Sequence, residues 1–287
     1  MDEISTYLIQ TMPDKEKFLS GEFYYKAFDE NRKTFVPYRL TGVKQASLVG
    51  TAFDYLARFE VAKVASDKDC KTLIAEKAIS KLWELGYKQE CREAQKLYEW
   101  SLYVIDEYIH GKGNHSEHKM IDICQFLAVL EHIVRDNTLD EIPMIGQKAC
   151  DDIKYELLGL IEAFKKYFVT RYVGKNSRVV YNPTFTCCGY ADADIWIDGC
   201  LYDFKTTKNI GYNENEVKQL WWYVLLHAID KRHIALGTFQ SYDIDSMALY
   251  KARCADVDKV KLDKEYVNNC ANELEQLLRK YRLYREI

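Results

Sequence analysis

The stretch ADADIWIDGCLYDFKTTK, residues 191–208, decides how the second half of the chain folds. Asp198 and Gly199 stand between two apolar runs. Such a dipeptide is the strongest short-range signal for a β-hairpin, because a type I′ turn needs positive φ at both central positions. A two-residue turn also fixes the register of the hairpin. We expect the opposed pairs to be Ile197 with Cys200, Trp196 with Leu201, Ile195 with Tyr202, Asp194 with Asp203, and Asp192 with Lys205.

This register predicts two different faces for the hairpin, because successive side chains of a strand point to opposite sides. The first face is a core surface made of Ala193, Ile195, Ile197, Cys200, Tyr202 and Phe204. The second face carries Asp192, Asp194, Asp203 and Lys205, with Trp196 and Leu201 towards the turn. We therefore expect a charged cluster at one end of the sheet.

The opposed carboxylates of this cluster need compensation. Directly opposed residues have Cβ atoms about 4.5–5.5 Å apart, and like charges at that distance are destabilising. Protonation of one carboxylate, pairing with Lys205 or a divalent cation would each compensate. Oxygen-rich clusters suit Mg²⁺ or Mn²⁺. The alternative is a solvated sheet face with a surface Asp–Lys pair.

Around the hairpin, the hydrophobic pattern divides the chain into a helical part and a mixed part. Apolar positions recur at three and four residues in five segments, which predicts helices over 46–65, 69–85, 90–109, 117–134 and 151–168. After Gly174 we expect strands over 178–185, 192–198, 200–206, 233–242 and 247–252, a helix over 216–229 and an amphipathic helix over 266–287. The sequence thus predicts one α+β domain, residues 1–287, with a mixed central β-sheet flanked by helices. Within it, residues 65–170 form a helical insertion and residues 175–287 form the core with its C-terminal helix.

The amino-acid composition says less about the class of protein than the hydrophobic pattern does. With 287 residues, of which 48% are hydrophobic and 29% charged, the chain reads as a globular protein. We see neither a secretion signal nor a long apolar segment, so we expect a cytoplasmic protein that does not enter a membrane. The nine cysteines form no CxxC pair and are expected to be reduced core residues. His110, His115 and His118 group in a loop, where a metal role is the alternative to simple solvation.

The formal net charge of −4 argues against a strongly basic surface for nucleic acid. The acidic excess lies in residues 1–150, however, and residues 151–287 are neutral. A neutral region can still bind phosphate through a local basic stripe if metal ions mask its acidic site.

Two features outside the hairpin add to the charged cluster. Gln219 and Tyr223 are four residues apart on the helix that follows, so they share one face. Upstream, Asp54 lies four residues after Gly50 and three before Ala57 on a predicted helix. These small neighbours would let a backbone approach closely and aim the Asp54 carboxylate at the sheet.

At this point the motifs resemble a known family. Asp194 followed by Asp203-Phe204-Lys205 on a hairpin resembles the core of the PD-(D/E)XK nuclease superfamily, which implies a restriction-endonuclease-like fold. The QxxxY spacing of Gln219 and Tyr223 is similar to the additional motif of the RecB-like exonuclease branch. That branch also carries a GxxxH helix, and here Gly50 is followed by Asp54 at the position of the histidine.

The resemblance implies a metal-dependent DNA nuclease, exonuclease-like, that works in bacterial or phage DNA processing or defence. Asp194 and Asp203 would hold Mg²⁺ or Mn²⁺, with the Phe204 carbonyl as a third oxygen and Asp54 reaching from its helix. Asp192 is the rival first acid, because residues 189–192, GYAD, match how some relatives write this motif.

The remaining residues of the motifs would act on the substrate. Lys205 would lower the pKa of the attacking water or stabilise charge on the phosphate. Gln219 and Tyr223 would position the nucleic-acid backbone or order the lysine and metal site, although Tyr223 could instead be a core residue. Lys208 and Lys218 would contact phosphates, or else belong to a solvated charged loop.

Some members of the branch hold an iron–sulfur cluster through one cysteine ahead of the first motif and three near the C-terminus. In this chain no cysteine precedes Cys70, and only Cys254 and Cys270 follow Tyr223, so we expect no iron–sulfur cluster. Two other readings stay open. The chain could be a catalytically weak or inactive subunit that binds DNA or a partner protein such as a helicase, or it could cleave RNA.

Overall fold

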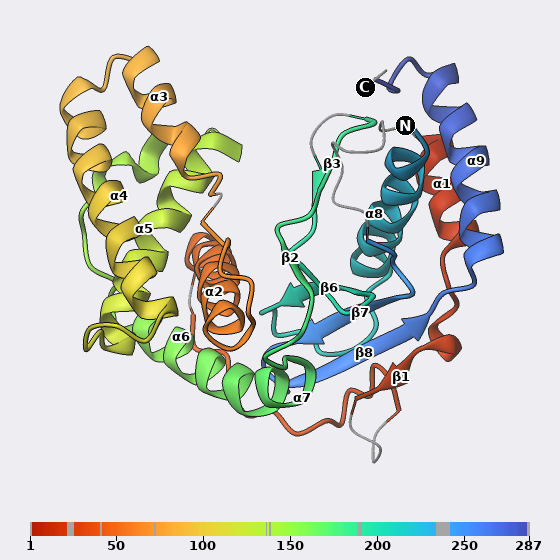
Figure 1. Ribbon diagram of the computed structural model, residues 1–287, viewed down its shortest axis with the longest axis horizontal. Helices are drawn as coiled ribbons and strands as arrows, with labels where there is room; N and C mark the ends of the chain where they lie inside the picture. The colour runs from red at the N-terminus through yellow and green to blue at the C-terminus, as the bar shows by residue number, and fades with distance from the viewer. Residues whose placement is uncertain are drawn as a thin grey trace. The chain divides into compact units, whose positions relative to one another are not determined.

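The computed structural model describes residues 2–21, 26–40, 42–71, 73–135, 137, 139–188, 191–233 and 242–285 (Figure 1). The chain divides into two compact units, each considered by itself below. The sheet unit consists of Met1–Lys33, Arg178–Lys205 and Asn209–Ile287, and the helical unit of Thr34–Ser177 and Thr206–Lys208. The helical unit therefore takes in more of the chain than the predicted insertion over 65–170.

The sheet unit is built on six strands in the order β1-β8-β7-β6-β5-β2. Their bounds are β1 Leu19–Ser20, β2 Val179–Tyr181, β5 Ile195–Ile197, β6 Cys200–Lys205, β7 Ser246–Lys251 and β8 Asp256–Lys261. The β6–β7 pair is parallel and the other pairs are antiparallel, so the sheet is mixed. A second sheet pairs β3 (Thr184–Phe185) with β4 (Ala191–Asp192).

The turn between β5 and β6 is the one that the sequence predicts. Asp198 and Gly199 have φ angles of 46° and 90°, as a type I′ turn requires. Ile197 pairs with Cys200, Trp196 with Leu201 and Ile195 with Tyr202, which confirms the predicted register for these three pairs.

Before Ile195 the chain departs from that register. Asp192 pairs with Thr184 in the second sheet, so the expectation that it faces Lys205 is wrong. The register of the hairpin would place Ala193 opposite Phe204, but the Ala193 N–H donates to Pro183 O instead. Asp194 is outside the ladder, and its Oδ2 accepts a hydrogen bond of 2.5 Å from the Phe204 N–H. Strand β5 begins only at Ile195, so it offers no main-chain carbonyl to the Phe204 N–H. The Asp194 carboxylate takes the place of that carbonyl.

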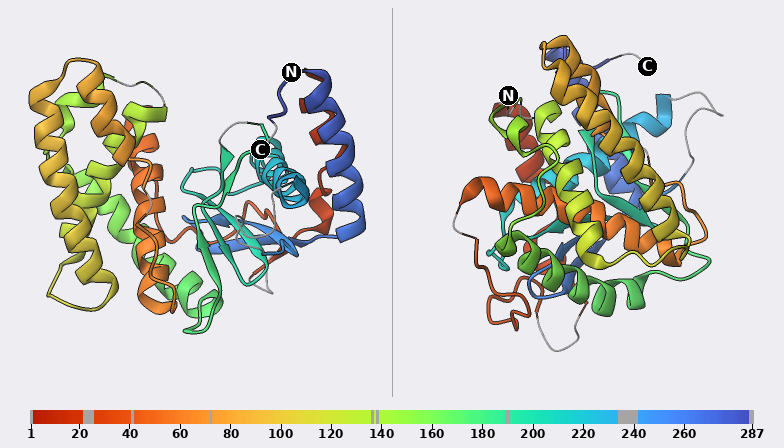
Figure 2. Two further views of the ribbon diagram at one scale, coloured as in Figure 1. Left: turned by 45° about the horizontal axis from the view of Figure 1, so that its top comes forward. Right: turned by 90° about the vertical axis from the view of Figure 1, so that its left-hand side faces the viewer.

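Three helices, α1 (Asp2–Thr11), α8 (Glu214–His233) and α9 (Lys264–Lys280), lie together on one face of the sheet (Figures 1 and 2). Helix α8 connects β6 to its parallel neighbour β7, as a parallel pair requires. Trp196, Leu201 and Met247 from the sheet share a core with Leu220, Val224 and Leu274 from the helices. The α+β fold with a mixed sheet flanked by helices is therefore confirmed.

The helical unit contains the predicted helices with shifted ends. They are α2 (Val43–Val64), α3 (Glu76–Glu84), α4 (Lys88–Ile109), α5 (Glu117–Arg135) and α6 (Asp151–Ala163), which continues as a π-helix over Phe164–Val169 and as α7 (Thr170–Tyr172). Helix α2 packs on α5 and α6, and α3 packs on α4 and α5. Helix α3 begins at Glu76, seven residues later than predicted, and ahead of it Asp67 Oδ1 accepts from the Asp69 N–H.

The sequence pattern missed α1, β1 and β8. The sequence of β8, DVDKVK, is rich in charged residues, which is unusual for an interior strand. Asp256 and Asp258 are nevertheless buried, because the guanidinium of Arg32 pairs with both. The ion pairs hide the alternation that would mark a strand. The strand expected over 233–242 falls almost entirely on residues 234–241, which lie outside the described residues.

Candidate active site

The charged cluster centres on β6, an interior strand of the mixed sheet. Asp203 and Lys205 are two residues apart and therefore project from the same face of the strand. Asp203 is only 4% exposed, and Lys205 Nζ lies 2.6 Å from its Oδ2. The predicted acid and lysine thus form a largely buried ion pair.

Helix α8 adds the two residues of the predicted QxxxY motif. Lys205 Nζ donates to Gln219 Oε1 at 3.1 Å, and Gln219 Nε2 donates to the Tyr223 hydroxyl at 2.8 Å. Asp203, Lys205, Gln219 and Tyr223 therefore form one continuous chain of polar contacts. The amide of Gln219 fixes the directions of both its neighbours, since its oxygen faces the ammonium and its nitrogen faces the phenol.

Tyr223 is held between the aromatic core and the acids. Its ring stacks on Phe185 with centroids 5.7 Å apart. Burial, followed by the negative charges of Asp203, Asp194 and Asp192, raises the pKa of Tyr223 far above its ordinary value. The hydroxyl therefore stays protonated. It accepts from Gln219, and within the described part of the chain no acceptor takes its own proton.

Lys205 keeps its charge despite its burial. Burial works to lower the pKa of Lys205, but the nearby carboxylates of Asp203 and Asp194, with Glu216, raise it above the usual value. The same pattern shows that Asp194 is close enough to act on both Lys205 and Tyr223.

The residues present fit a cation held by two carboxylates better than one held by a complete protein cage. No group of three or more His, Cys, Asp or Glu side chains in the described residues has the arrangement of a metal site. Asp203 Oδ2, however, is a buried carboxylate oxygen, and the Lys205 ammonium 2.6 Å away is its counter-charge. Mg²⁺ commonly takes one or two carboxylates and completes its shell with water and substrate phosphate. Asp203 on β6 is one such carboxylate, and Asp194, which accepts from the Phe204 N–H, is a second on the same hairpin.

The other predicted site residues are not members of this chain of contacts. Asp54 is on α2 in the helical unit, where its carbonyl accepts from Arg58 Nε at 3.3 Å. Lys208 is exposed and belongs to the same unit. Lys218 Nζ donates to Ser5 Oγ of α1 at 3.1 Å rather than to a member of the cluster. The GYAD reading rests partly on Gly189 and Tyr190, which are outside the described residues, although Asp192 itself is half-buried on β4.

Sequence reasoning missed a second buried ion pair beside the cluster. Lys251 is 1% exposed, and its Nζ lies 2.5 Å from Glu216 Oε2. Lys251 is the register partner of Lys205 on the parallel strand, so two lysines lie side by side, each with its own carboxylate. The sequence feature that could have indicated this ion pair is Glu216, which is three residues before Gln219 and hence on the same face of α8.

Comparison with protein-family models, with curated proteins and with solved structures gave no significant match to this chain. Among the helices described, we find none that combines the length and the apolar character needed to cross a bilayer.

Proposed function

We propose that this protein is a metal-dependent deoxyribonuclease that hydrolyses phosphodiester bonds. The observation that carries the proposal is the contact chain from Asp203 through Lys205 and Gln219 to Tyr223, with Asp194 beside it. Two motifs that are separate in sequence meet in one polar cluster. A solvated sheet face would not need a buried carboxylate and an amide that orients the lysine.

The proposal extends to the fold. We assign the sheet unit a restriction-endonuclease-like core, formed by the β5–β6 hairpin, helix α8 and the parallel strand β7. Support comes from the position of Asp203 and Lys205 on an interior strand and from the position of Gln219 on the helix that follows it.

In this function Asp194, Asp203 and the Phe204 carbonyl would hold Mg²⁺ or Mn²⁺, with Asp192 as a further candidate ligand. When bound, such an ion supplies a water with a lowered pKa and counter-charge for the phosphate. Lys205 binds a non-bridging phosphate oxygen and stabilises the charge that develops there. Gln219 keeps the ammonium directed at that position, and the Tyr223 hydroxyl donates its unused proton to the substrate backbone.

The decisive experiment compares the wild-type protein with Lys205→Ala. Linear and circular DNA, single- and double-stranded, are incubated with Mg²⁺, Mn²⁺ or EDTA. The wild type should cleave DNA only with metal, and Lys205→Ala should cut the rate by about a hundredfold or more. Lys261→Ala, an exposed lysine on β8, is the matched control and should retain full activity. Metal-dependent cleavage that survives Lys205→Ala would show that this cluster is not the active site.

The same assay shows whether Asp194 or Asp192 is the first acidic residue of the motif. Asp194→Asn should abolish cleavage and Asp192→Asn should reduce it less, because Asp194 lies against the β6 main chain whereas Asp192 pairs with β3. The reverse order would make Asp192 the principal ligand.

A second function, a non-catalytic subunit that binds DNA or a protein such as a helicase, is favoured by two observations. No three-ligand group occurs among the described residues, and the first motif carries Asp54 in place of a histidine. Binding of DNA without cleavage under every metal condition would support this function over the first.

A further inference from the structure

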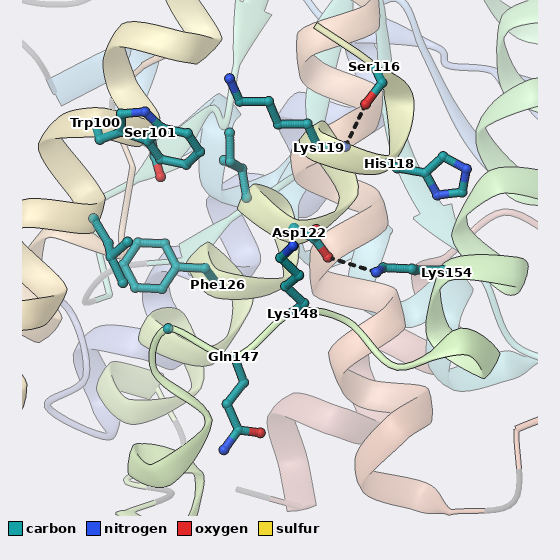
Figure 3. Close-up of a pocket in the computed structure, with 13 residues that line it drawn as sticks. Trp100, Ser101, Ser116, His118, Lys119, Asp122, Phe126, Gln147, Lys148 and Lys154 are labelled. Atoms are coloured by element: carbon teal, nitrogen blue, oxygen red, sulfur yellow. Dashed lines mark hydrogen bonds and ion pairs between the residues drawn. The ribbon is translucent and has the colours of Figure 1, made fainter.

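A pocket of about 600 Å³ opens in the helical unit, far in sequence from the charged hairpin (Figure 3). Its walls come from α4, from the first half of α5, from the segment that leads into α6 and from the first turn of α6. Its volume is in the range of pockets that take small organic ligands. None of the residues that line it belongs to the proposed nuclease site.

One wall of the pocket is aromatic. Trp100 of α4 and Phe126 of α5 both line it, and Figure 3 shows them on the same side. Trp100 is 46% exposed, which is high for the largest apolar side chain. The wall therefore offers a flat surface on which an aromatic ring could stack.

The polar side of the pocket is positively charged. Lys119, Lys148 and Lys154 line it, against a single carboxylate, Asp122. The carboxylate is already engaged, because its Oδ1 accepts from the Ala149 N–H at 3.0 Å and lies 3.5 Å from Lys154 Nζ. The three lysine ammonium groups that line the pocket thus face one carboxylate, Asp122, which is already hydrogen-bonded.

Two of these lysines have no carboxylate of their own among the described residues. Lys119 Nζ contacts His115 Nδ1 at 3.2 Å and lies 4.9 Å from the Trp100 ring centre. Glu107 offsets part of this charge from the far side of His115, where it contacts Nε2 at 2.7 Å. Lys148 is exposed and makes no side-chain contact with the described residues.

Beside Trp100, the pocket has a hydroxyl group that forms no hydrogen bond with the described residues. Ser101 is 1% exposed and lines the pocket, yet its hydroxyl forms no hydrogen bond within the described ranges. The Ser101 hydroxyl is not one of the fully buried side-chain atoms that lack a partner in the described residues, so it reaches the pocket and needs a polar partner there. A polar atom of a bound ligand would supply that partner.

Helix α5 adds a fixed dipole. Its first turn lines the pocket through His118 and Lys119, and Ser116 Oγ accepts from the Lys119 N–H at 3.3 Å. The positive end of this 19-residue helix therefore lies at the pocket and favours an anion there.

We propose that this pocket binds a small organic anion in which a flat aromatic ring carries a phosphate or carboxylate, a ligand of about the size of a mononucleotide. The ring stacks on Trp100, a polar atom of the ligand hydrogen-bonds to Ser101, and the acid group lies between Lys119 and Lys148. The aromatic wall would contact the ring of the ligand and the lysines would contact its acid group. A ligand that carries both groups should therefore bind more tightly than one that carries only one of them.

The test is calorimetric titration of the full chain with four probes. Adenosine 5′-monophosphate and indole-3-carboxylate carry both the ring and the acid, whereas adenosine and inorganic phosphate each carry one of them. At least one of the first two should bind about tenfold more tightly than either fragment. Absence of binding by both complete probes would overturn the proposal, as would a fragment that binds equally well.

Variants then locate the binding. Lys148→Ala should weaken binding about tenfold, because an exposed lysine can be removed without disturbing the fold and its hydrogen bond to the anion is charge-assisted. Ser101→Ala should weaken it less, and Trp100→Ala should remove the advantage of ring-bearing probes. Lys96→Ala, an exposed lysine elsewhere on α4, is the control and should bind as the wild type does. Unchanged affinity in Lys148→Ala would contradict the proposed site. Lys205→Ala should also bind normally, so this test is independent of the nuclease proposal.

Discussion

The ring and the hydroxyl of Tyr223 lie in different surroundings. Its ring fills space against Phe185, and its hydroxyl ends the polar chain that begins at Asp203. The sequence left open whether this tyrosine belongs to the core or to the site. The structure places its two ends in different environments, and the two roles are therefore separable by mutation.

Tyr223→Phe should lower the DNA cleavage rate by about tenfold to a hundredfold, because it removes one positioned donor. The free energy of unfolding should change by no more than about 1 kcal/mol, since the hydroxyl accepts a single hydrogen bond from Gln219. Cleavage assays and urea unfolding measure the two effects. Tyr212→Phe, also in the sheet unit, is the control, and a Tyr223→Phe enzyme with full activity would remove this residue from the mechanism.

His227 predicts a dependence of stability on pH. Burial is the main cause that lowers the pKa of His227, to about 4 from an ordinary 6.5. As the pH falls through this interval, the unfolded chain takes up the proton before the folded chain does. The free energy of unfolding should therefore fall by about 3 kcal/mol from this residue alone between the two pKa values, with no contribution above the higher one.

His227→Gln isolates that contribution, because the amide can still donate to the Tyr242 carbonyl that His227 contacts at 3.0 Å but cannot take up a proton. Urea unfolding at a series of pH values should give a shallower acid loss for this variant than for the wild type. His118→Gln, an exposed histidine whose side chain contacts no other described residue, should follow the wild-type curve. Parallel curves for wild type and His227→Gln would show that His227 titrates normally.

Among the elements, the β5–β6 hairpin depends most on one dipeptide. Gly199 has φ of 90°, and a Cβ there would lie 2.9 Å from Asp245 Oδ2. Gly199→Ala should therefore destabilise the protein by about 1–3 kcal/mol through backbone strain. Gly174→Ala, with an ordinary φ and a nearest contact of 3.7 Å, is the matched control. Equal melting temperatures for the two variants would mean that the turn tolerates a side chain.

The elements also show what sequence patterns can predict. The hairpin, α8 and the helices of the helical unit follow from turn chemistry and periodicity, because these are local properties. Strand β8 was missed because Arg32, more than two hundred residues away, neutralises Asp256 and Asp258. The predicted pairing of Asp192 with Lys205 was wrong because Asp192 pairs with Thr184 of β3, a contact outside the hairpin that local spacing does not predict.

On the scale of the whole molecule, a net charge of −4 works against binding to DNA. If the proposed function is right, divalent cations must offset the repulsion between the phosphate backbone and the acids around Tyr223. We therefore expect DNA affinity, measured by fluorescence anisotropy with Lys205→Ala to prevent cleavage, to fall at least about tenfold when EDTA removes the metal. Equal affinity with and without metal would argue for a cation-independent binding surface.

The candidate site was predictable to the extent that it lies on one hairpin and one helix. Asp203, Lys205, Gln219 and Tyr223 come from two consecutive elements, and their spacing brings them together. The ion pair of Lys251 with Glu216 depends on the parallel pairing of β6 and β7, which local spacing does not determine. Asp54 lies in the helical unit, and its part in the site is a prediction from the sequence motif alone.

Asp194 has two tasks that rest on different properties of one side chain. Its oxygen closes the end of the β5–β6 ladder by accepting from the Phe204 N–H, and its charge is what the proposed chemistry needs. An asparagine at this position would keep the oxygen and lose the charge. A single-nucleotide change could therefore silence such an enzyme while leaving its architecture intact, so a descendant could keep the scaffold for binding long after it stopped cutting.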